Sequence, residues 1–148
     1  MATSGNLVLA QTPYLVNLSL AAVTACTTRA PTATASLAAA NIFLLVPAST
    51  NGCRIDQIRI KACSSAITAP TAAQMVTIWE WDGTNAYPYD EILVSIVTPA
   101  ISATPSFQIL QQYQGLVLPL THALYASTTV TTTAATTAIC ITAIGALL

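Results

Sequence analysis

Apolar and polar residues alternate with a period near two along much of this chain, and the runs are short and bounded by Pro, Gly or Asn. That pattern is typical of half-buried strands, whereas a helix repeats its apolar positions every three or four residues. Thr, Ala, Val and Ile dominate, and β-branched side chains pack well on a pleated surface. We predict strands over Tyr14–Val23, Ala35–Val46, 53–63, 74–81, 89–97, Phe107–Gln111, Leu116–Leu118, His122–Thr128 and Thr137–Ile144. The alanines of the second segment would also suit a short helix.

The stretch CRIDQIRIKAC, residues 53–63, has the clearest alternation. Its later isoleucines fall on one face, while Arg59 and Lys61 fall on the other. Ile55 is out of phase with Ile58, which predicts a β-bulge or the end of a turn between them.

Two dipeptides predict tight hairpin turns, Asn51-Gly52 and Asp82-Gly83, because these residue types tolerate positive φ. About eight short strands joined by such turns indicate an all-β antiparallel β-sandwich, and we expect a jelly roll. We expect residues 1–13 to form an extended N-terminal arm and residues 14–148 to form a single domain, which suits a chain of 148 residues.

Charged residues make up 6% of the chain, against about 25% in an ordinary soluble domain. The net charge of −1 leaves no basic field, so we expect neither nucleic-acid binding nor attraction to an anionic membrane. The longest apolar run, Leu37–Ala48, contains Asn41 and Pro47, and it is shorter than the roughly 20 residues that a spanning helix needs.

The few charges are also distributed unevenly, because no Asp, Glu, Lys or Arg occurs between Ile92 and the last residue. Free monomers ordinarily cover much of their surface with charge, whereas the centres of interfaces are depleted in it. We therefore expect much of the surface contributed by the two ends of the chain to lie against other subunits.

The four cysteines, Cys26, Cys53, Cys63 and Cys140, lack the two-residue spacing of zinc or redox motifs. Their even number would permit two disulfides, but a domain of this size does not need them. We expect four small, mostly buried thiols in a protein made in a reducing compartment.

Candidate chemistry is sparse, and we expect no enzyme, no cofactor and no metal site. The cluster of Glu80, Asp82, Asp90 and Glu91 has no calcium-loop spacing, and we interpret it as hairpin and edge chemistry rather than as the carboxylate pair of a glycosidase. His122 is the only histidine, and we expect a structural role for it. Asp56, Asp82 and Asp90 are the acids that we expect to be able to orient it through the fold.

Three segments, STNGCRIDQIRIKACSS, MVTIWEWDGTNAYPYDEILV and GLVLPLTHALYAST, together resemble small proteins encoded near the major capsid genes of tailed bacteriophages. The shared pattern is an Asn-Gly turn, Arg-Ile-x-x-Ile-x-Ile, a hydrophobic strand into Asp-Gly-Thr, an acidic-Ile-x-Val strand and a Leu-x-Leu-Pro step. The resemblance covers roughly residues 50–128. It implies a capsid cement or decoration protein that binds as a dimer or trimer to the major capsid protein on the virion surface, after synthesis in the host cytoplasm.

On this interpretation we expect two groups of residues to contact partners. The ends of the chain contribute Leu7, Val8, Leu9, Pro13, Leu147 and Leu148, and the charged strand contributes Arg54, Arg59 and Lys61. The alternative is a tail or spike adhesin that binds carbohydrate. An adhesin would expose a platform made of Trp79, Trp81, Tyr87 and Tyr89, whereas in a cement protein the two tryptophans would lie mostly in the core.

Overall fold

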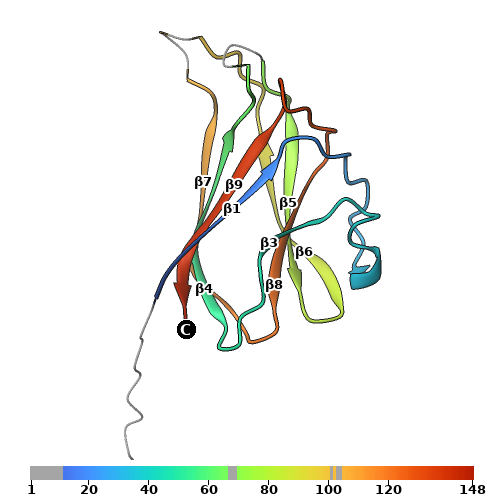
Figure 1. Cartoon of the computed structure of the whole chain (residues 1–148), viewed down its shortest axis with the longest axis vertical. Coiled ribbons are helices and arrows are strands. Elements are labelled where there is room, and N and C mark those ends of the chain that lie inside the picture. The colour runs from blue at the N-terminus through green and yellow to red at the C-terminus, as the bar shows by residue number, and fades with distance from the viewer. Residues whose placement is uncertain (1–11, 67–69, 101, 103–104) are drawn as a thin grey trace, which may run out of the picture.

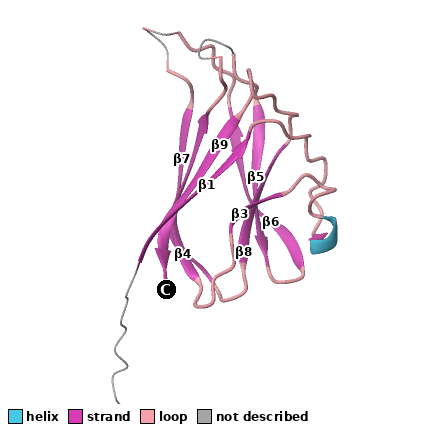
Figure 2. Cartoon of the chain, viewed as in Figure 1, coloured by secondary structure: helices cyan, strands magenta, loops and turns pink. Residues whose placement is uncertain are grey.

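The structure is a computed structural model that describes residues 12–66, 70–100, 102 and 105–148. The regular structure of these residues is strand apart from one short 3₁₀ helix, η1 (Thr34–Ser36), which confirms the all-β prediction (Figure 2). The strands are β1 (Thr12–Leu20), β2 (Thr32–Ala33), β3 (Phe43–Val46), β4 (Cys53–Ala62), β5 (Gln74–Trp81), β6 (Asn85–Val94), β7 (Gln108–Leu118), β8 (Ala123–Thr128) and β9 (Ile139–Leu147).

The strands form two antiparallel sheets that face each other in a sandwich-like arrangement (Figure 1). Sheet A has the order β1-β9-β4-β7, and sheet B has the order β2-β6-β5-β8-β3. Every strand pair is antiparallel. The prediction of an antiparallel, sandwich-like arrangement of two sheets is therefore confirmed.

The main core fills the space between the two sheets. Its fully buried side chains come from alternate positions of both, as expected where the inner faces of two sheets meet. Sheet A contributes Leu20, Ile55, Ile58, Ile60, Ile139 and Ile141, and sheet B contributes Val76, Ile78, Val94 and Leu124.

Strand β4 confirms the alternation read from the sequence. Ile58 and Ile60 have no exposed surface, whereas Arg59 and Lys61 are exposed. The pairing of β4 with both β7 and β9 shifts register between Ile55 and Gln57, so the predicted bulge is present.

Two of the predicted strands differ from the structure. Residues 35–46 form the end of η1, a turn and the short β3, because the alanines carry too little β preference to extend the strand. Phe107–Gln111 and Leu116–Leu118, predicted as separate pieces, mostly belong to one strand, β7, in which Gly115 adopts a positive φ of 78°.

Of the two predicted hairpins, only Asp82-Gly83 joins paired strands, β5 and β6. Asn51-Gly52 instead crosses from β3 in sheet B to β4 in sheet A, so the hairpin prediction was wrong there. Glycine is still required at 52, because its φ is +83° and a Cβ would lie 2.6 Å from the carbonyl oxygen of Leu118.

The chain itself covers the part of the outer face of sheet B around Trp79, while Leu44 of β3 and Leu93 of β6 stay 47% and 66% exposed on that face. The segment between β1 and β3 packs on it and forms a second buried cluster in which Cys26, Leu37 and Ile42 surround Trp79. Figure 2 shows η1 on the outer side of sheet B, away from β1 and β9. The Trp81 indole N–H donates to Thr34 Oγ1 at 2.7 Å and ties this covering segment to β5.

The cysteines only partly match the expectation of free thiols. Cys26 and Cys53 are buried and free, and burial raises the pKa of the Cys53 thiol. Cys63 and Cys140 instead form a disulfide with a Cα–Cα distance of 5.7 Å. Sequence spacing could not show this pair, because β9 becomes the neighbour of β4 only in the folded sheet.

Among the described residues there is no helix of the length and apolar character needed to cross a membrane.

Candidate assembly surface

No described segment of this chain covers the outer face of sheet A (Figure 1). The strand register arranges its side chains in rows that run across β1, β9, β4 and β7 in turn. The rows are Ser19–Cys140–Lys61–Gln108, Asn17–Thr142–Arg59–Leu110, Leu15–Ile144–Gln57–Gln112 and Pro13–Ala146–Arg54–Val117. The Cys63–Cys140 disulfide lies at the end of this face that carries the row Ser19–Cys140–Lys61–Gln108.

Large apolar side chains are exposed on both margins of this face. Leu15 of β1 is 59% exposed, and Leu110 and Val117 of β7 are 49% and 53% exposed. Between them the hydroxyl of Thr142 donates to Asn17 Oδ1 at 2.7 Å, and Thr142 is itself buried. The face is therefore mixed: exposed aliphatic side chains and amides lie on its margins, and its two central strands carry Thr142, Gln57, Arg59 and Lys61 beside Ile144 and Ala146.

The charge on this face is positive. Arg59 and Lys61 are both exposed and form no ion pair within the described residues. Arg54 is also on this face, but its guanidinium binds the Asp56 carboxylate at 2.7 Å, across the bulge. A partner on this face would therefore meet two unpaired cations among amides and aliphatic side chains.

The residues at the two chain ends that we predicted to contact partners differ in location and in exposure. Pro13 lies within β1 opposite Ala146, so the strand begins one residue before the expected end of the arm. Leu147 is half-buried and packs against the main core, whereas Leu148 is 37% exposed. Leu7, Val8 and Leu9 lie outside the described residues.

The uncharged carboxyl end has an explanation inside the chain. Strand β9 lies between β1 and β4, and Ile139, Ile141 and Ala143 are buried in the main core. A central strand with a buried inner face has little room for charge. Contact with other subunits is therefore not needed to explain the absence of charged residues from β9.

The acidic cluster of the sequence is dispersed over the fold, and each of its carboxylates binds a neighbour. Glu80 pairs with His122 Nδ1 at 3.0 Å, so the acid beside the histidine is Glu80 rather than any of the three expected aspartates. Glu91 pairs with Arg29 at 3.0 Å, on the outer side of sheet B. Glu80 and Glu91 therefore bind different partners.

The two aspartates of the cluster serve the local structure. Asp82 Oδ1 accepts hydrogen bonds from the backbone N–H groups of Asn85 and Thr84, which lower its pKa. Asp90 Oδ2 accepts the Tyr113 hydroxyl at 2.9 Å and thereby joins β6 to β7 across the edge of the sandwich. Burial of the Tyr113 hydroxyl and, to a lesser extent, the neighbouring Asp90 carboxylate raise the pKa of Tyr113 well above its ordinary value.

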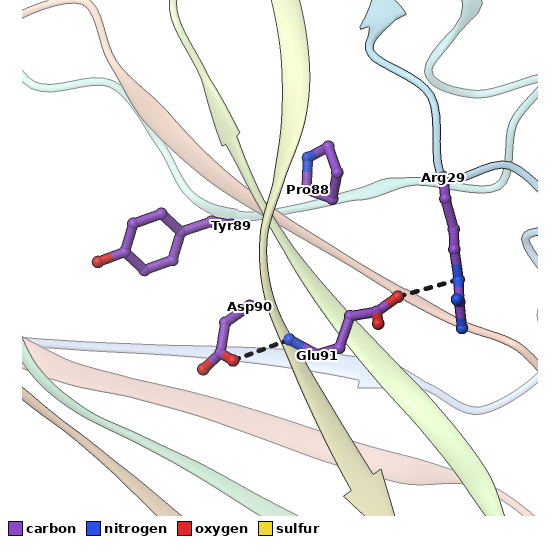
Figure 3. Close-up of a pocket in the computed structure, with 5 residues that line it drawn as sticks. All are labelled: Arg29, Pro88, Tyr89, Asp90 and Glu91. Carbon is purple, nitrogen blue, oxygen red and sulfur yellow. Dashed lines mark hydrogen bonds and ion pairs between the residues drawn. The ribbon is translucent and has the colours of Figure 1, made fainter.

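A hollow of the surface lies beside β6, with a volume of about 510 Å³ and a lining of Arg29, Pro88, Tyr89, Asp90 and Glu91. Figure 3 shows the Glu91 carboxylate directed at Arg29, while the Tyr89 ring points away from that pair. The Arg29–Glu91 pair is electrically neutral, and the lining contains no cysteine, serine or histidine as a nucleophile or base. We find no chemistry to assign to it.

The four aromatic residues of the adhesin alternative do not form one platform. Trp79 is fully buried, and its indole N–H donates to Ser127 Oγ at 2.9 Å. Trp81 is half-buried against Tyr125, with ring centroids 6.4 Å apart. Only Tyr87 and Tyr89 are exposed.

Within the part of the chain that the structure describes, no group of three His, Cys, Asp or Glu side chains is placed to hold a metal ion. Comparisons with protein-family models, with curated proteins and with solved structures gave no match.

Proposed function

We propose that this chain is a structural virion protein, a cement or decoration protein that binds the outside of an icosahedral phage head through the outer face of sheet A. The observation that carries the proposal is the contrast between the two sheets. A segment of the chain covers the outer face of sheet B around Trp79 and leaves Leu44 and Leu93 exposed on that face, whereas no described segment covers sheet A, where Leu15, Leu110 and Val117 are exposed. Exposed apolar groups framed by polar ones are typical of interaction surfaces.

The chemistry of the face indicates what it binds. Arg59 and Lys61 are its unpaired charges, so the complementary surface on the major capsid protein is acidic or rich in hydrogen-bond acceptors. Amides and hydroxyls lose less on desolvation than charges do, which suits a surface that is wet before assembly and buried afterwards. The partners are the major capsid protein and further copies of this chain.

We also propose that the sandwich is a jelly roll. With the two-residue β2 set aside, the order β1-β9-β4-β7 faces the order β6-β5-β8-β3. Two interlocked Greek keys produce this alternation of early and late strands between the sheets. The architecture is common among viral capsid domains, which supports the assignment to a virion.

Cementing requires only complementary area. A standard specific interface buries about 1,200–2,000 Å² in total, and a micromolar contact corresponds to about −8 kcal/mol. Repeated over the lattice, such contacts stabilise a shell against internal pressure without any chemical step.

Quantitative mass spectrometry of virions made by the genome that encodes this chain tests the proposal. We expect a copy number equal to that of the major capsid protein or a simple fraction of it, such as one third. A handful of copies per particle would place the protein at a vertex or in the tail, and absence from particles would overturn the assignment.

The surface itself is tested by charge reversal on heads stripped of the protein. Arg59→Glu should weaken rebinding by tenfold or more, because it reverses a charge at the centre of the contact face. Arg29→Glu is the control, since it reverses an exposed arginine on the outer side of sheet B, where it also breaks the ion pair with Glu91. Equal effects of the two substitutions would show that sheet A is not the contact face.

A further inference from the structure

The four outer strands of the two sheets differ in how well they are protected against pairing with another chain. Exposed strand edges are templates for association, and proteins blunt them with short strands, bulges, charge or Pro. At the edges of sheet B, β2 has two residues, and β3 has four with a register shift. At one edge of sheet A, β7 carries the bulge opposite Ile55–Gln57 and the positive φ of Gly115.

Strand β1 lacks most of these protections. It pairs with β9 over nine residues without a register shift, and β9 is its only strand partner among the described residues. Its sequence, TPYLVNLSL, contains no charged residue, and its one proline, Pro13, lies near the start. Thus β1 is the one long, regular and uncharged edge of the described sandwich.

We propose that β1 pairs with β1 of a second copy in an antiparallel, two-fold symmetric arrangement that joins two sheets A into one continuous sheet. The inference deepens the proposed function, since it rests on the self-association that a cement protein uses and identifies the strand responsible. A second copy suits this edge because identical uncharged strands can pair about a dyad without bringing like charges together.

The register follows from the length of the strand. Pairing of all nine residues places Val16 on the two-fold axis and sets Leu15 of each copy directly opposite Asn17 of the other. Leu15 and Asn17 both lie on the outer face, where Leu15 is 59% exposed beside Ile144. Dimerisation would therefore continue the rows of the assembly surface across the axis.

A pair of double variants of the full chain tests both the partner and the register. Leu15→Lys with Asn17→Lys places two pairs of lysines directly opposite each other across the axis. Leu15→Glu with Asn17→Lys places two pairs of opposite charges at the same positions. Both variants lose the Asn17 acceptor of the Thr142 hydroxyl, so that loss is matched between them.

Sedimentation equilibrium over a range of protein concentrations provides the readout, and thermal melting of each variant confirms that it is folded. We expect the wild-type protein and the Glu/Lys variant to form dimers, and we expect the Lys/Lys variant to dissociate with a constant at least about tenfold higher than that of the Glu/Lys variant. A monomeric or trimeric wild type, or equal dissociation constants for the two variants, would overturn the inference.

The outcome is separable from that of the proposed function, because no capsid is present. A monomer that still coats stripped heads would overturn β1 pairing and leave the cement role intact. A dimer that does not bind heads would leave β1 pairing intact and overturn the cement role.

Discussion

The disulfide between Cys63 and Cys140 gives the most quantitative prediction. It joins the residue that follows β4 to the central strand β9, and it closes a sequence separation of 77 residues. Reduction removes this constraint without changing the sequence, and Cys63→Ser with Cys140→Ser removes it permanently. Cys26 and Cys53 are free and buried, so neither treatment involves a second bridge.

The size of the effect follows from the loop that the bridge closes. For a separation of 77 residues, the loss of chain entropy in the unfolded state corresponds to about 4.5 kcal/mol at 25 °C, and bridges typically contribute 2–4 kcal/mol. In a domain of this length, each kcal/mol shifts the melting temperature by about 2–4 °C. We therefore expect reduction to lower the melting temperature by roughly 5–15 °C.

Differential scanning calorimetry of the air-oxidised protein, with and without a phosphine reductant, measures the shift. Alkylation under denaturing conditions and intact-mass analysis first establish that two thiols are free and two are bridged. The double serine variant is the control, since it should melt like the reduced protein and be insensitive to reductant. If a fully bridged sample melts at the same temperature after reduction, the argument from chain entropy is wrong.

Three further perturbations follow from single contacts. Tyr113→Phe should lower the free energy of unfolding by about 1.5 kcal/mol in urea titrations at pH 7, because it removes the bond to the Asp90 carboxylate. Since burial and the Asp90 carboxylate raise the pKa of Tyr113, the wild type should keep its advantage below the ordinary tyrosine pKa of about 10 and lose stability relative to the variant as pH rises above that value. Gly145→Ala should cost more than about 2 kcal/mol, because a Cβ would collide with the backbone carbonyl of Arg54 at the bulge; a chemical denaturation midpoint within error of the wild type would contradict this. Trp79→Phe should shift tryptophan emission to longer wavelength and increase acrylamide quenching, since it removes the fully buried one of two tryptophans.

Local sequence signals predicted the features that depend on neighbouring residues. The alternation in β4 and the phase break at Ile55 were sufficient to predict the strand and its bulge. Asp82-Gly83 was sufficient for its turn, because the Asp82 carboxylate bonds the amides of the same turn. These features require no knowledge of which strands become neighbours.

Features that depend on strand order could not be predicted in this way. Asn51-Gly52 fixes a local φ but does not determine that the chain passes to the other sheet. The disulfide and the Glu80–His122 pair join residues 77 and 42 positions apart, and both exist because their strands become neighbours only in the folded sandwich. The sequence likewise could not show that the outer face of sheet A is exposed, because that depends on the segment between β1 and β3 packing on sheet B and not on sheet A.

The absence of charge from the carboxyl-terminal part is a weaker argument for assembly than composition suggests, because β9 is a central strand and owes its apolar character to its own core. The exposed threonines that precede it also have local roles, since Thr137 Oγ1 accepts the backbone N–H of Thr133 at 2.8 Å. Burial within the chain leaves unexplained the uncharged edge of β1, the exposed Leu15 and the two unpaired cations of β4 on sheet A, and also the exposed Leu44 and Leu93 on sheet B. Only sheet A combines exposed aliphatic side chains with unpaired cations and a regular, uncharged edge strand, and one charge reversal and one pair of edge variants test it as an assembly surface.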